Sequence, residues 1–122
     1  MVVIEKTIRS KKEFIELIET SDKTIVFKFS ADWCGPCKTI KPEVDFFKES
    51  ITDNEKILWF DIDVDQSMEV FGMLKTKRIV SGVPAILVYF DENDTIYPDE
   101  FVLSSNKKDL EYLFAKIMEV SK

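Results

Sequence analysis

The chain has 122 residues, of which 45% are hydrophobic and 33% are charged, and its formal net charge at pH 7 is −6. This length and composition are typical of a single soluble domain over residues 1–122, which can bury about two-thirds of its unfolded surface. The acidic balance argues against nucleic-acid binding, which needs a clustered basic face, and no apolar run reaches membrane-spanning length.

The first half of the chain predicts strand, helix, strand and helix in turn. Residues 2–5 resemble a short strand, and Ser10 and Glu13 have the spacing of a capping box that opens a helix. Residues 24–30 are rich in β-branched and aromatic side chains and predict a second strand. A helix over about 35–50 follows, with Pro42 expected to kink it. Its apolar residues recur at helical spacing: Ile40, Val44, Phe47 and Ile51.

The only two cysteines of the chain stand where this strand gives way to this helix, in Trp33-Cys34-Gly35-Pro36-Cys37-Lys38. At a helix N-terminus, unpaired N–H groups and the helix dipole, roughly half a positive charge, favour the thiolate of Cys34. Cys37 lies one turn deeper and can close a disulfide with Cys34 or attack a mixed disulfide formed there. Gly35 allows a tight approach, and Pro36 falls in the first turn, where a missing N–H costs nothing.

Metal sites are the main alternative for such residues. Zinc bound through C-x-x-C needs two more soft ligands, but the chain has no histidine and no third cysteine, which excludes a closed site within one chain. The run Asp61-Ile62-Asp63-Val64-Asp65 fails as a calcium loop, because Gln66 stands at the turn glycine and Gly72 at the bidentate glutamate. We therefore expect no metal.

The second half predicts strand, helix, two strands and a last helix. Residues 56–64 predict a strand, and Asp65 is the expected N-cap of a helix ending near Leu74. The basic residues of the loop over 75–83 are expected to be solvated, or to form a docking spot for an acidic partner. A strand over 85–90, a turn over 91–94 and a returning strand over about 95–103 follow, and Pro98 suits only a sheet edge. A helix over about 106–120 ends the chain.

The motif Trp33–Lys38, with Pro42 five residues after the second cysteine, resembles the active site of the thioredoxin family. Gly82-Val83-Pro84-Ala85, directly before a strand, resembles a second motif of that family. The element order β-α-β-α-β-α-β-β-α matches the thioredoxin fold, an α/β fold whose mixed sheet has helices on both faces.

The resemblance implies several roles around the cysteines. The bond before Pro84 would be cis, with the proline facing the disulfide. The backbone of Val83, after Gly82, would pair with an extended substrate segment. Trp33 would shield the disulfide and offer partners an apolar contact.

The resemblance also implies the reaction, in which Cys34 attacks a disulfide of a protein substrate and Cys37 releases the product. No bound cofactor is expected besides the redox-active Cys34–Cys37 disulfide; electrons would come from NADPH through a thioredoxin reductase. Charges at Glu5 and Lys6 come too early for a signal peptide, so we expect a location in the cytoplasm. We also expect a monomer with no membrane partner. Two alternatives stay open: a thioredoxin-fold binding or scaffold subunit whose cysteines are not required, and a disulfide oxidase or isomerase.

Lys28 departs from the family pattern, because many thioredoxins have a buried aspartate six residues before the first cysteine. Alternation along the strand places Lys28 opposite Phe27 and Phe29, on a covered face where a charge needs a partner. We hypothesise that Lys28 pairs with Asp61 beneath Cys37. Asp61, or water held by the pair, would relay a proton, and the cation would favour the Cys37 thiolate. The alternative is a lysine that extends to solvent without a catalytic part.

Overall fold

The computed structural model describes residues 2–4 and 7–122, and its elements follow the predicted α/β order. Those elements are, in chain order, β1 (Val2–Ile4), α1 (Lys11–Thr20), β2 (Thr24–Ser30), α2 (Gly35–Ser50), β3 (Ile57–Asp63), the 3₁₀ turn η1 (Val64–Gln66), α3 (Met68–Thr76), β4 (Ala85–Tyr89), β5 (Glu100–Val102) and α4 (Lys107–Val120). Within the described ranges, no helix combines the length and the apolar character that crossing a bilayer requires.

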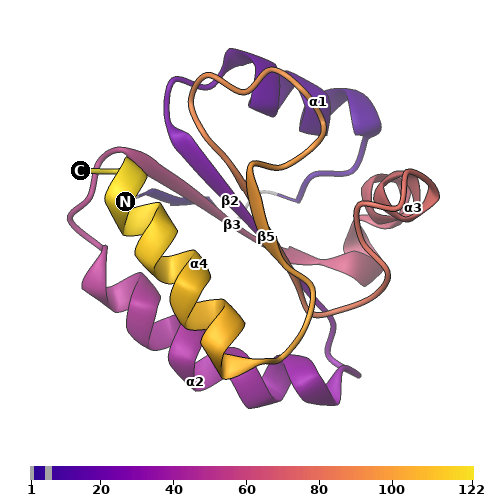
Figure 1. Ribbon diagram of the computed structural model, residues 1–122. Coiled ribbons are helices and arrows are strands. Elements are labelled where there is room, and N and C mark those ends of the chain that lie inside the picture. The colour runs from indigo at the N-terminus through magenta and orange to yellow at the C-terminus, as the bar shows by residue number, and fades with distance from the viewer. Residues whose placement is uncertain (1, 5–6) are drawn as a thin grey trace.

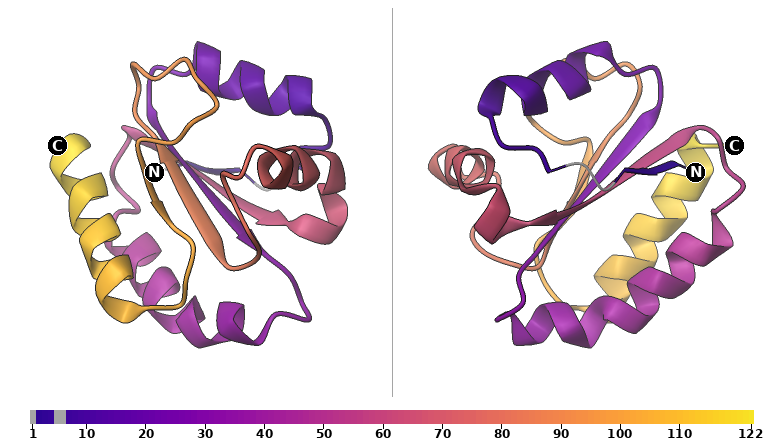
Figure 2. Two further views of the ribbon diagram at one scale, coloured as in Figure 1. Left: turned by 45° about the vertical axis from the view of Figure 1, so that its right-hand side comes forward. Right: turned by 180° about the vertical axis from the view of Figure 1, so that it is seen from behind.

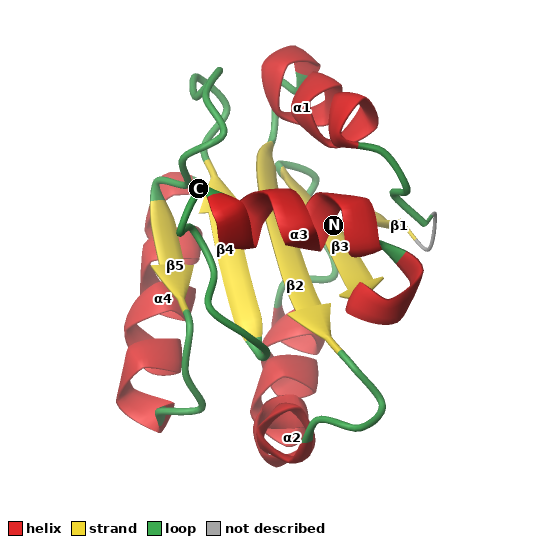
Figure 3. Ribbon diagram, turned by 90° about the vertical axis from the view of Figure 1, so that its right-hand side faces the viewer, coloured by secondary structure: helices red, strands yellow, loops and turns green. Residues whose placement is uncertain are grey.

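The strands form one mixed sheet in the order β1-β3-β2-β4-β5. β3 runs parallel to both of its neighbours, β1 and β2, whereas β4 is antiparallel to β2 and to β5. Helices α1 and α3 cover one face, and α2 and α4 cover the other (Figures 1 and 3). Turning the molecule shows the same two layers from either side (Figure 2). The predicted mixed sheet with helices on both faces is confirmed.

Each face of the sheet has its own core, because alternate residues of β2 point to opposite sides. Phe27 and Phe29 belong to the cluster under α1 and α3, where the Phe27 ring lies 4.6 Å from Phe14 and 5.2 Å from Phe60 between centroids. Val26 and Trp59 belong to the cluster under α2 and α4. Lys28 shares this second face and contributes a charge to it, as alternation predicts.

The helix after β3 does not begin where the sequence predicts. Asp63, not Asp65, caps the chain there: its side chain accepts a hydrogen bond from the Asp65 N–H at 2.9 Å and opens η1. Helix α3 starts afterwards, at Met68, with Ser67 in the N-cap position. Short acidic side chains can satisfy backbone N–H groups in neighbouring registers, so two aspartates two residues apart compete for the same role.

The predicted returning strand over 95–103 shortens to β5, which pairs only with β4 in the sheet order and so occupies the predicted edge. Side chains replace the ladder over residues 91–99: the Asn93 amide donates to the carbonyl of Tyr97, and Asp99 accepts from the N–H of Phe90 at 2.7 Å. Pro98 has no N–H to donate to a ladder, which favours this loop over a longer strand.

Candidate active site

Cys34 and Cys37 form a disulfide at the N-terminal end of α2, with their Cα atoms 5.3 Å apart. Cys34 is the N-cap residue of α2, and its sulfur accepts a hydrogen bond from the Cys37 N–H at 3.1 Å. Both cysteines are buried, and Pro36 lies in the first turn as predicted. The sulfur of Cys34 thus occupies the place that an oxygen occupies in an ordinary N-cap.

This placement decides the chemistry of the reduced pair. A Cys34 thiolate would keep the N–H of Cys37 as a hydrogen-bond donor and would lie at the positive end of the helix dipole. Hydrogen bonding and dipole both favour the thiolate, the form of cysteine that attacks disulfides. The site therefore has the two properties that exchange needs, an activated nucleophile and a second thiol within bonding reach.

Trp33 is 68% exposed beside the cysteines, and its indole N–H donates to the carboxylate of Asp65 at 3.0 Å. Asp65 lies in η1, so the contact joins the loop before α2 to the 3₁₀ turn before α3. Sequence reasoning gave Asp65 to a helix cap and missed this role. The contact orients the indole at the protein surface, where a partner can reach it.

The second motif lies at the start of β4. The Val83–Pro84 bond is cis, as predicted, and Pro84 is buried. Val83 is half-buried and packs against the apolar cluster that contains both cysteines. Val83 and the disulfide thus belong to the same core, although about 45 residues separate the two motifs in the sequence.

Gly35 and Gly82 are not required by packing within the chain. A Cβ atom built at either position would meet no atom within 4 Å, and neither residue has a positive φ. The space above both glycines is open, so the tight approach expected at Gly35 involves nothing in the fold itself. It remains a prediction about an incoming substrate.

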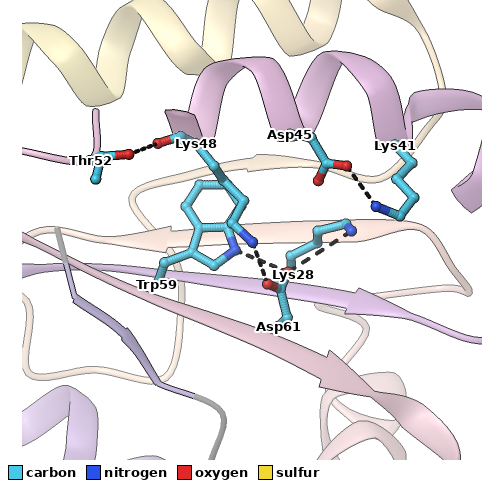
Figure 4. A network of polar contacts seen from close by, with 7 residues as sticks. All are labelled: Lys28, Lys41, Asp45, Lys48, Thr52, Trp59 and Asp61. Atoms are coloured by element: carbon cyan, nitrogen blue, oxygen red, sulfur yellow. Dashed lines mark hydrogen bonds and ion pairs between the residues drawn. The ribbon is translucent and has the colours of Figure 1, made fainter. Parts of the chain in front are cut away.

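The predicted pair of Lys28 and Asp61 is present, with Nζ and Oδ1 3.9 Å apart on neighbouring strands (Figure 4). Asp61 has stronger partners, however: Lys48 Nζ lies 2.7 Å from its Oδ2, and the Trp59 indole N–H donates to its Oδ1 at 3.0 Å. Sequence reasoning missed both. Trp59 precedes Asp61 by two residues on β3, so strand alternation was the available signal that both side chains share one face.

Lys28 and Asp61 differ in what they line. A hollow of about 260 Å³ beside Cys37 includes Lys28 in its wall, whereas Asp61 lines a different one. The residues around the Cys37 hollow are Lys28, Ser30, Ala31, Asp32, Cys37, Lys38, Lys41 and Asp63. Burial lowers the pKa of Lys28 below its ordinary value, and the Asp61 carboxylate offsets only part of that effect.

A metal centre has no candidate in this region. Among residues 2–4 and 7–122, no three histidine, cysteine, aspartate or glutamate side chains gather closely enough to hold a metal ion.

Comparison with known proteins gives a consistent picture. The family model Thioredoxin matches residues 5–116. A thioredoxin from Pongo abelii is 34% identical over 107 residues, which are 87% of this chain and 92% of that protein. A thioredoxin from Mus musculus is 42% identical over 73 residues, 59% of this chain and 67% of that one. The solved structure of Plasmodium falciparum thioredoxin superposes with a TM-score of 0.64 at 29% identity, covering 91% of this chain and 97% of that chain.

Proposed function

Because the chain belongs to the thioredoxin family, we infer that it is a protein disulfide reductase that works through Cys34 and Cys37. Thiol–disulfide exchange is the chemistry of the family, and the fold is the thioredoxin fold. The observation that carries the inference is the Cys34–Cys37 disulfide at the capped end of α2.

The reaction proceeds in two exchanges. The Cys34 thiolate attacks one sulfur of a substrate disulfide, which breaks that bond, forms a mixed disulfide and releases the first substrate thiolate. Cys37 then loses its proton and attacks the Cys34 sulfur, so the second substrate thiolate leaves and the enzyme disulfide forms. Two electrons pass from the enzyme dithiol to the substrate, and the released thiolates take up protons.

The substrate is held, in this proposal, by residues on either side of the disulfide. Trp33 offers an exposed aromatic surface held in place by Asp65, and the backbone of Val83 pairs with an extended segment of the substrate. Gly82 and Pro84 keep that backbone accessible beside the cysteines. The open space above Gly35 supports an approach from this side.

The oxidised protein needs an electron donor, and we propose a thioredoxin reductase that draws on NADPH, with this chain acting as a monomeric electron carrier in the cytoplasm. The support is chemical: a catalytic disulfide turns over only where its reduction is supplied, as it is in a reducing compartment. NADPH oxidation that requires reductase, this protein and a disulfide substrate together would support the electron route. Cell fractionation would test the location.

The reductase activity is tested directly by reduction of a protein disulfide with dithiothreitol. We expect the wild type to accelerate the reaction, Cys34→Ser to abolish the acceleration, and Cys37→Ser to accumulate mixed disulfides with the substrate. A wild-type rate equal to that of dithiothreitol alone would overturn the proposal in favour of a scaffold role. Rapid oxidation of a reduced protein, without net reduction, would favour an oxidase or isomerase instead.

A further inference from the structure

We infer that the ammonium group of Lys28 stabilises the Cys37 thiolate and so sets the reduction potential of the Cys34–Cys37 couple at a less negative value than the site would have without it. Lys28 is a positioning residue in this inference: it touches no substrate and acts through the electrostatic effect of its charge on the Cys37 sulfur. The inference rests on the proposed function of the two cysteines and adds what controls their redox balance.

Lys28 lies on the central strand β2, on the face covered by α2, and 11% of its side chain is exposed. It lines the hollow of about 260 Å³ that Cys37 also lines. Because Lys28 and Cys37 are both buried, a charge on one interacts with a charge on the other more strongly than it would in bulk water.

Among the residues that the structure describes, Lys28 has no close counter-ion in the oxidised protein. Its one ion pair among the described residues is the 3.9 Å contact with Asp61, whose two oxygens already bind Lys48 and Trp59 at 2.7 and 3.0 Å (Figure 4). Asp45, the other carboxylate whose charge acts on Lys28, is held by Lys41 at 2.6 Å. A thiolate formed beside Lys28 would supply the missing anion.

The remaining charges around Lys28 leave this conclusion unchanged. Three lysines and two aspartates line the hollow, so its wall favours an added negative charge. These groups are Lys28, Lys38 and Lys41 against Asp32 and Asp63. Lys48 and Asp61 act on Lys28 from outside the hollow, with opposite signs.

The sign of the effect on the potential follows from the reaction. A thiolate exists only in the reduced protein, so any group that stabilises it favours the reduced form and raises the reduction potential. By reciprocity, the thiolate also favours the charged form of Lys28. Removing the charge should make the protein a stronger reductant, while its Cys37 becomes a poorer nucleophile near neutral pH.

The test compares Lys28→Met with Lys107→Met, which removes a cation of α4 that pairs with Glu43 at 3.5 Å and leaves both the hollow and the Asp61 network intact. Each protein is equilibrated with a glutathione buffer, and its reduced fraction is counted after alkylation. Cys37 is titrated by thiolate absorbance in a Cys34→Ser background. For Lys28→Met we expect about a tenfold shift toward the disulfide, equivalent to about 30 mV, and a Cys37 titration moved to higher pH. Lys107→Met should stay within about twofold, and Lys28→Arg should restore the wild-type values.

Two outcomes would overturn the inference: equal equilibria and Cys37 titrations in wild type and Lys28→Met, or equal shifts in Lys28→Met and Lys107→Met. If Lys28→Met does not fold, Lys28→Gln gives the same comparison with a long uncharged side chain. A wild type that titrates and equilibrates as expected but reduces no protein disulfide would refute the proposed function alone.

Discussion

The two faces of the sheet bury polar groups in different ways. Under α1 and α3 the core is built on Phe14, Phe27 and Phe60, and the buried Tyr89 hydroxyl is satisfied by the carbonyl of Ile96 at 2.7 Å. Under α2 and α4 the apolar cluster adjoins Lys28, whose charge has one long ion pair within residues 2–4 and 7–122. The first face is arranged for packing, and burial there raises the pKa of Tyr89 without creating a charge.

The comparison shows which face of the sheet carries a buried charge that is incompletely paired, and this is the face of Lys28. Burying an incompletely paired charge is unfavourable, and mutational experience shows that apolar replacement of buried ion pairs is often neutral or stabilising. The charge of Lys28 lines the hollow that Cys37 also lines, although both cysteines pack in the cluster under α1 and α3. A cost located beside the reacting groups agrees with a role in their chemistry, and four experiments can test the contrast.

The largest expected effect is on the packed face. Phe27→Ala removes a ring that contacts Phe14, Phe60 and Tyr89 with centroids 4.6, 5.2 and 5.7 Å away. We expect the free energy of unfolding to fall by about 3–5 kcal/mol, since the surrounding rings cannot close the cavity. Urea unfolding of the oxidised protein measures this. A loss below about 1 kcal/mol would mean that this face repacks freely, and the contrast would fail.

Trp59→Phe tests the polar network on the other face. It removes the indole N–H that binds the Asp61 carboxylate, and hydrogen bonds to charged groups contribute about 1.5–3 kcal/mol. Trp33→Phe is the matched control, because it removes the same kind of bond, to Asp65, at a position that is 68% exposed. We expect the control to lose less than half as much stability in the same unfolding assay. Equal losses would show that burial does not strengthen the Asp61 network.

Tyr89→Phe measures a neutral hydrogen bond on the packed face. The substitution keeps the ring and removes the donor to the Ile96 carbonyl, so we expect a loss of about 0.5–1.5 kcal/mol. Thermal unfolding at neutral pH is sufficient. A loss larger than that of Trp59→Phe would reverse the proposed ranking of the two faces.

The smallest effect is the pH dependence that Lys28 contributes to stability. Its folded pKa is lowered by burial, so between that pKa and the ordinary value near 10.5 the unfolded chain binds more protons. Stability from this group therefore rises as the pH increases through that window. Urea unfolding of oxidised wild type and Lys28→Met against pH should show the rise in wild type only. Tyr89 titrates in both proteins, so its contribution cancels in the difference.

Features that depend on local chemistry could be predicted from the sequence. The cap at Cys34 and the proline in the first turn follow from spacing, and alternation places Lys28 on a covered face, whereas Asp61 as its partner came from the family resemblance. The cis bond before Pro84 followed from the family resemblance.

Other features depend on which of several equivalent partners a side chain meets in space. The choice of Asp63 over Asp65 as a cap, the engagement of Asp61 by Lys48, and the side-chain bonds that shorten β5 are of this kind. In each case several neighbouring polar groups could form nearly equivalent hydrogen bonds or ion pairs locally. Contacts between elements distant in the sequence determine which of these groups does so.

One atom, the sulfur of Cys34, serves both the helix and the reaction, since it holds the first turn of α2. Serine is among the best N-cap residues, so a hydroxyl at this position should preserve the fold of an inert protein, whereas alanine would remove the acceptor and the nucleophile at once. Both variants lack the nucleophile, so the difference between the melting temperatures of Cys34→Ser and Cys34→Ala measures how much the N-cap acceptor contributes to stability. The Cys34→Ser protein would also bind substrates non-covalently, because residue 34 could no longer form a mixed disulfide with them.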